Sequence, residues 1–174
     1  MTHGLRSFVA IRYLLFAICY LLFAIHYSLT MSQLLLSESQ KNQVVAAIKN
    51  AELQTSGEVR VHIEERCAEP DVLERAKQVF TELGMRRTEL QNGVLFYVSV
   101  NDRKFAIIGD KGINEKVPAG FWESTRDLLK SHFVKNEFAE GLSAGIEETG
   151  KHLKAFFPHQ SDDINELPDD ISFG

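Results

Sequence analysis

The stretch Asn92–Lys116, NGVLFYVSVNDRKFAIIGDKGINEK, decides the fold because two apolar runs in it meet across a polar turn. Gly93–Val100 is a continuous run of mainly β-branched and aromatic residues, which is typical of a strand buried on both faces. Lys104–Ile108 is a second, shorter apolar run, and Asn101 and Asp102 supply turn residues between the two. The stretch therefore predicts a β-hairpin.

The return strand of this hairpin leads into Gly109-Asp110-Lys111-Gly112, which we predict to be a loop. Its two glycines can adopt positive φ without steric cost. Asp110 would then lie exposed at the end of a strand, where its carboxylate is presented beside accessible backbone groups.

The sequence on either side of the hairpin predicts one further strand and four helices. Ser37–Gln40 has the form of a capping box, and apolar spacing predicts a helix from there to about Gln54. Glu58–Glu64 alternates apolar and charged residues, as in a half-buried strand, and we interpret His62 on its charged side as a surface histidine. Apolar periodicity predicts the other helices between Pro70 and Gly84, from near Pro118 to Lys135, and over about Glu137–Phe156.

This order of elements predicts an α/β fold, an α/β/α sandwich in which helices cover both faces of a small mixed β-sheet. A length of 174 residues is enough for one domain with its own hydrophobic core. We divide the chain into an apolar N-terminal segment (1–30), the folded domain (31–158) and an acidic C-terminal tail (159–174), which we expect to be irregular.

Residues 1–30 are apolar and repetitive. The tetrapeptides AIRY, AICY and AIHY begin at Ala10, Ala17 and Ala24, which is the pattern of a translated tandem DNA repeat, and Met31 follows directly. Two interpretations are open. Translation starts at Met31 and the protein is cytoplasmic, which we favour, or residues 13–29 anchor the chain in a membrane.

Charge and cysteine content exclude several classes of function. The net charge is −5, and since residues 1–30 contribute +2 from Arg6 and Arg12, the rest of the chain carries −7. An acidic surface argues against nucleic acid as a partner. Cys19 and Cys67 are the only cysteines and form no CxxC pair, so neither a disulfide framework nor a structural zinc site is expected. We expect a monomer.

Six blocks of the sequence, in order, resemble the TPM domain family, over about Ser37 to Pro168. The blocks are TSGEVRVHIE at Thr55–Glu64, Leu83-Gly84-Met85 with Thr88, Asn92–Leu95, Asp102–Ile113, Phe121-Trp122, and DINELP at Asp163–Pro168. The resemblance implies an α/β sandwich fold. Some members of the family are described as acid phosphatases, as photosystem II repair factors or as divalent-metal binders. Many carry a C-terminal membrane helix, whereas this chain stops just after the NELP segment and resembles the short, soluble bacterial branch.

Four residues with hard oxygen donors are the candidate metal ligands. They are Glu58 at the start of the first strand, Asn92 before the hairpin, Asp102 in its turn and Asp110 at the end of its second strand. If these segments gather at one edge, such ligands suit Ca²⁺ or Mg²⁺, and Asp110 is the candidate catalytic residue. The alternative is that Asp102 and Asp110 are turn formers and Glu58 is a solvated strand end.

The acidic tail is a second candidate for metal binding. Its polar residues fail the template of an EF-hand loop, because Leu167 occupies a ligand position and the central glycine is absent. We therefore interpret the cluster as solvated. Its members are Asp162, Asp163, Asn165, Glu166, Asp169 and Asp170.

The usual phosphatase signatures are missing. Cys67 has no arginine six residues later, and the sequence contains no DxDx(T/V) motif and no HxxH pair. Two hypotheses follow. The first is a divalent-metal-binding protein with phosphomonoesterase activity on a phosphorylated substrate, and the second is a noncatalytic interaction module that docks a protein partner in assembly or repair.

Overall fold

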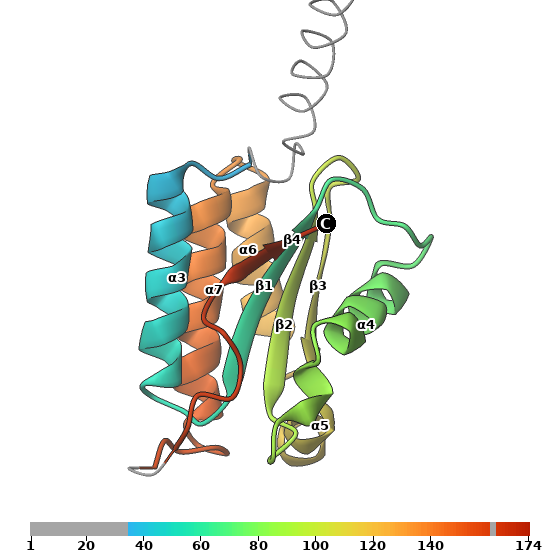
Figure 1. Cartoon of the computed structure of the whole chain (residues 1–174). Coiled ribbons are helices and arrows are strands. Elements are labelled where there is room, and N and C mark those ends of the chain that lie inside the picture. The colour runs from blue at the N-terminus through green and yellow to red at the C-terminus, as the bar shows by residue number, and fades with distance from the viewer. Residues whose placement is uncertain (1–34, 161–162) are drawn as a thin grey trace, which may run out of the picture. The chain divides into compact units, whose positions relative to one another are not determined.

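A four-stranded mixed sheet in the order β3-β2-β1-β4 forms the centre of the fold, in a computed structural model that describes residues 35–160 and 163–174 (Figure 1). Its strands are β1 (Glu58–Glu64), β2 (Gly93–Ser99), β3 (Lys104–Gly109) and β4 (Ile171–Phe173). β1 lies parallel to both β2 and β4, whereas β2 and β3 are antiparallel. The predicted hairpin is therefore confirmed.

Helices cover both faces of this sheet, which confirms the predicted α/β/α sandwich (Figure 1). One face carries α3 (Glu38–Glu52), α6 (Glu123–Phe133) and α7 (Phe138–Leu153), and the other carries α4 (Val72–Glu82). The 3₁₀ helix η1 (Met85–Arg87) follows α4, and the short helix α5 (Lys111–Lys116) follows β3.

The hydrophobic core has two parts, one on each side of the sheet. Val59, Val61 and Ile63 of β1 are fully buried against α3, α6 and α7. On the other side, Phe80 of α4 packs with Tyr97 of β2. All seven residues of β2 are buried, as its continuous apolar run predicts. Removal of this apolar surface from water is the main contribution to folding.

Capping and close packing explain why the three helices on one face form where they do. The Ser37 side chain accepts from Gln40 N (3.3 Å) and Gln40 Oε1 accepts from Ser37 N (2.9 Å), which confirms the predicted capping box of α3. A Cβ on Gly150 would lie 2.8 Å from the Cα of Ala51 in α3. The glycine therefore allows α7 and α3 to approach closely.

The prediction that β1 is half-buried is wrong, because all seven of its residues are buried. Its polar side chains are covered on the α4 side, and the C-terminal tail contributes to the cover. Arg60 forms an ion pair with Asp170, and His62 Nδ1 lies 2.8 Å from Ser172 Oγ. His62 is only 6% exposed, so its interpretation as a surface histidine is also wrong.

The predicted loop at residues 109–112 is in fact the start of α5. Asp110 is the N-cap residue of this helix and is 4% exposed, so the expected exposed carboxylate is not found. Neither Gly109 nor Gly112 has positive φ. Gly112 is needed for another reason, because a Cβ there would lie 2.1 Å from the carbonyl oxygen of Leu90.

The tail is not wholly irregular, because Ile171–Phe173 forms β4 beside β1. The repetitive segment 1–30 lies outside the described residues, so the start at Met31 and the anchor at 13–29 stay predictions. Within the described part of the chain, no helix has the length and apolar character that crossing a membrane requires.

Candidate functional site

Three of the four predicted ligands lie at the same end of the sheet. The strand register pairs Glu58 with Gly93, and Asp110 N donates to Gly93 O (2.9 Å), so Glu58, Gly93 and Asp110 form one row across three strands. Asn92 lies next to this row, and its carbonyl oxygen accepts from Glu58 N (3.3 Å).

Asp102 lies at the opposite end of the hairpin. The ladder between β2 and β3 runs from Val94 and Gly109 to Ser99 and Lys104, and Asp102 is in the turn beyond it. Its Oδ2 accepts from Cys67 N (2.6 Å) and from Ser99 Oγ (2.9 Å), and these donors lower its pKa. Asp102 therefore holds the turn together and cannot complete a site with the other three residues.

The carboxylate of Glu58 binds the backbone of the tail. Its two oxygens accept from Glu166 N (3.0 Å) and Leu167 N (3.2 Å), and the Glu166 carboxylate in turn accepts from Glu89 N (3.0 Å). Burial raises the pKa of Glu58, although the two backbone donors oppose the shift. Glu58 is thus not a solvated strand end, and it brings the acidic tail to the end of the sheet.

A hollow of about 400 Å³ lies at this junction between the end of α3, the start of β1 and the tail. We call it the acidic pocket, since four carboxylates line it together with Asn165; they belong to Glu52, Glu58, Asp163 and Asp169. The structure therefore unites Glu58 with part of the tail cluster, which the sequence suggested only as two separate candidates.

Glu52 is the residue of this pocket that sequence reasoning missed. Its Oε1 accepts from Val59 N (2.9 Å), but burial, followed by the nearby carboxylates of Asp169 and Glu58, raises its pKa to about 9. The sequence contained a signal for Glu52, because this acidic residue lies in the last turn of α3, where a negative charge interacts unfavourably with the helix dipole. Its presence there therefore suggests a role other than helix stability.

Asn92 and Asp110 each contain a buried oxygen without a hydrogen-bond partner in the described part of the chain. Asn92 Nδ2 donates to the carbonyl of Ser56, a residue that lines the acidic pocket, while its Oδ1 has no partner. Asp110 Oδ1 lies 3.5 Å from Arg86 Nη1, while its Oδ2 has no partner. Such orphaned oxygens are costly when buried and fit a cation or water nearby.

A second polar cluster lies between β1 and α4. His62 Nε2 lies 3.3 Å from Glu64 Oε1, and Glu64 also accepts from Arg75 Nε (3.0 Å) and from Tyr97 Oη (2.7 Å). Burial lowers the pKa of His62, which is therefore neutral at pH 7. Because Arg75 neutralises Glu64 and Ser172 Oγ also lies 3.2 Å from Val61 O, we interpret the cluster as structural.

Sequence and structure comparisons agree on the type of domain. A profile of the TPM domain matches residues 30–152. The BA42 protein from Bizionia argentinensis, whose NMR structure is known, has 48% sequence identity to this chain. The two structures superpose with a TM-score of 0.76, and the match covers 80% of this chain and 95% of that chain. No protein of curated function matches the chain.

Two more distant NMR structures share the fold alone. The N-terminal domain of a P. gingivalis protein is 20% identical, with a TM-score of 0.60 over 72% of this chain and 82% of that chain. The N-terminal domain of cg2496 from Corynebacterium glutamicum is 12% identical, with a TM-score of 0.54 over 78% of this chain and 79% of that chain. The profile match and the identity to BA42 show that the chain belongs to the TPM domain family.

Proposed function

We propose that this TPM domain binds a divalent cation, Ca²⁺ or Mg²⁺, in the acidic pocket. The observation that carries the proposal is that Glu52 lies buried beside Asp169 and Glu58: burial, and after it these two carboxylates, raise the pKa of Glu52 to about 9. Carboxylates crowded in this way are neutralised either by a proton or by a cation. A cation would replace the proton that Glu52 holds at neutral pH.

The donor set suits a hard cation. Carboxylate oxygens of Glu52, Glu58, Asp163 and Asp169, together with the amide oxygen of Asn165, are the types of ligand that Ca²⁺ and Mg²⁺ prefer. In residues 35–160 and 163–174, no three His, Cys, Asp or Glu side chains are already arranged around one ion. Binding would therefore draw these side chains together, and Asn92 would support the pocket through Ser56.

Calorimetric titration of the full chain with Ca²⁺ and with Mg²⁺ tests this proposal. We expect binding of at least one of the two ions, with affinity that rises between pH 6 and 9 as Glu52 loses its proton. The double variant Asp163→Asn, Asp169→Asn should bind about tenfold more weakly, equivalent to about 1.4 kcal/mol. Asp102→Asn, at the other end of the hairpin, is the matched control and should bind normally. The site would be refuted if the wild type bound neither ion, or if Asp102→Asn lost as much affinity as the double variant.

Phosphomonoester hydrolysis is the second candidate function. It is favoured by the resemblance to phosphatases and by Arg86 beside Asp110, because an arginine can bind a phosphate group. Against it, Asp110 is 4% exposed and would reach a substrate only if η1 or α5 moved. Turnover of an aryl phosphate with and without Ca²⁺ or Mg²⁺, in the wild type and in Asp110→Asn, measures this activity. Cation binding without turnover would favour the noncatalytic module.

A further inference from the structure

Among the residues that the structure describes, β3 pairs with β2 alone, so one edge of the sheet is open along β3. Because Asp110 N donates to Gly93 O, backbone groups of every second residue back along β3 also face β2. The backbone N–H and C=O groups of Phe105, Ile107 and Gly109 therefore point away from β2, in the plane of the sheet. In the described part of the chain, the N–H and C=O of Phe105 and Ile107 have no hydrogen-bond partner, whereas Gly109 is buried and its C=O accepts from Asn114 Nδ2 (2.7 Å).

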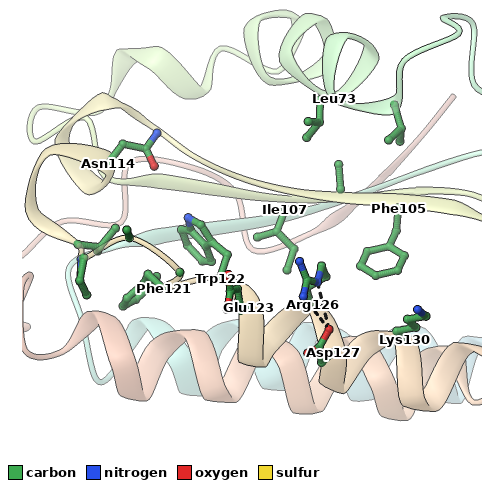
Figure 2. Close-up of a pocket in the computed structure, with 16 residues that line it drawn as sticks. Leu73, Phe105, Ile107, Asn114, Phe121, Trp122, Glu123, Arg126, Asp127 and Lys130 are labelled. Atoms are coloured by element: carbon green, nitrogen blue, oxygen red, sulfur yellow. Dashed lines mark hydrogen bonds and ion pairs between the residues drawn. The ribbon is translucent and has the colours of Figure 1, made fainter.

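A groove of about 930 Å³ surrounds this open edge (Figure 2). Leu73 of α4 lies on one side of β3, and Trp122 and Arg126 lie on the other. Phe105 and Ile107 line the groove on the α6 side of β3, the side of Trp122 and Arg126. A second hollow of about 790 Å³ continues along the same edge and shares Phe105 with the groove.

These features are what an added strand requires. Its backbone would bond to the open groups of β3, and its alternating side chains would contact the α4 wall on one side and the α6 wall on the other. Leu73 is 47% exposed, so the wall formed by α4 offers apolar surface to such a strand. Exposed edges of this kind are prone to pairing with another chain.

The charge around the groove indicates the chemistry of the partner. The basic residues that line the two hollows are Arg103, Lys104, Arg126 and Lys130, against the two acidic residues Glu123 and Asp127. Asp127 pairs with Arg126 (3.0 Å), and in the described part of the chain neither Arg103 nor Lys130 has an ion-pair partner. This surface is thus basic, although the chain after residue 30 carries a net charge of −7.

We propose that β3 docks an extended segment of a partner protein, in which apolar residues alternate along the strand and acidic residues flank them, as a fifth strand of the sheet. A second copy of this chain fits less well, because it would bring the same basic surface against itself. Acidic flanks instead complement the side chains of Lys104 and Lys130.

Binding of short peptides to the ¹⁵N-labelled full chain tests this proposal. The probes are decapeptides with two glutamates at each end and six central residues, in which apolar residues drawn from Val, Ile, Leu and Phe alternate with threonine. We expect the tightest binders to shift and protect the amides of Phe105 and Ile107. The same peptides with lysine ends should bind at least about tenfold more weakly, and N-methylation of their central amides should abolish binding.

Two kinds of variant separate docking at β3 from nonspecific attraction. Ile107→Pro removes an outward N–H and no hydrogen bond of the ladder, and should abolish binding. Lys104→Glu with Lys130→Glu leaves the backbone intact and should reverse the preference towards lysine-ended peptides. Lys154→Glu, at the end of α7, is the control for a change of charge away from β3, and it should bind the peptides as the wild type does.

Three results would overturn the proposal. The first is that no acidic-ended peptide binds at millimolar concentration. The second is that the peptides shift amides elsewhere or bind the Lys104→Glu, Lys130→Glu variant as well as the wild type. The third is a concentration-dependent dimer that protects the amide of Ile107, which would assign the edge to a second copy of the chain.

Discussion

The two ends of the β2–β3 hairpin hold carboxylates in opposite electrostatic states. In the turn, Asp102 accepts from a backbone amide and a hydroxyl, and these donors lower its pKa. At the other end, burial raises the pKa of Glu58 and, to about 9, that of Glu52. The difference teaches that hydrogen-bond donors alone do not set the state of a carboxylate: Glu58 and Asp102 each accept two hydrogen bonds, but Glu58 is buried beside other carboxylates, and it is there that we propose a cation.

The end of the sheet that carries the acidic pocket depends on close backbone contacts. Breaking one of these contacts should have the largest effect on the stability of the protein. Gly112→Ala places a Cβ 2.1 Å from the carbonyl oxygen of Leu90, and the backbone must shift to relieve it. We predict a loss of about 3 kcal/mol in the free energy of unfolding, measured with urea. Cation binding should weaken as well, since the row of Glu58, Gly93 and Asp110 adjoins this contact.

Gly57→Ala is the control for this substitution at the same end. Its Cβ would lie 3.1 Å from Leu153 Cδ1, so a side-chain carbon needs to shift by only a few tenths of an ångström, and no backbone atom lies as close as in Gly112→Ala. We expect a clearly smaller loss of stability. Equal losses in Gly57→Ala and Gly112→Ala would contradict the view that the Leu90 contact fixes the end of the sheet that carries the acidic pocket.

The protonation of Glu52 provides the next test. Its pKa is about 9 in the folded protein and 4.5 in an unfolded chain, so the native state binds more protons than the unfolded state between these pH values. Stability from this group is complete below pH 4.5 and is lost as pH rises to 9, by at most about 1.4 kcal/mol per pH unit.

Glu52→Gln keeps an acceptor for Val59 N and removes the titration, so its unfolding free energy should fall less steeply between pH 5 and 9. Saturating Ca²⁺ should flatten the wild-type profile in the same way, because the ion would replace the proton. Parallel profiles for the wild type and Glu52→Gln would show that Glu52 is not the group that titrates.

Local patterns predicted most of the fold because they act over short distances. The apolar run of β2, the capping box at Ser37 and the helical spacing each depend on neighbouring residues. The burial of the polar side of β1 depends instead on Asp170 and Ser172, which are 110 residues away from the side chains that they contact. A three-residue strand so distant in sequence leaves no periodicity that could reveal it.

The grouping of the candidate residues was predicted in part, and the two errors in it differ in kind. The separation of Asp102 from Asp110 follows from the hairpin itself, since a turn and the end of the return strand lie a full strand apart. That correction could have been made from the sequence. The contact of the tail with Glu58 could not, because hydrogen bonds from Glu166 N and Leu167 N use backbone groups that every residue carries.

A smaller effect is expected where Glu58 holds the tail. Glu58→Gln removes one of the two oxygens that accept from Glu166 N and Leu167 N, and should cost about 1 kcal/mol of unfolding free energy. Hydrogen exchange at these two amides should become faster. Glu115→Gln on the surface of α5 is the control, and unchanged exchange in Glu58→Gln would argue against the tail contact.

The smallest effect is expected at Asp102, and its pH dependence should have the opposite sign to that of Glu52. The lowered pKa of Asp102 means that its contribution is present above pH 3.8 and is lost as pH falls through the folded-state pKa. Asp102→Asn should therefore be slightly less stable than the wild type at pH 7 and equal to it in strong acid. Faster exchange of the Cys67 amide would locate the change in the turn. If Asp102→Asn instead altered stability above pH 7 or weakened Ca²⁺ binding, the two ends of the hairpin would not be electrostatically distinct.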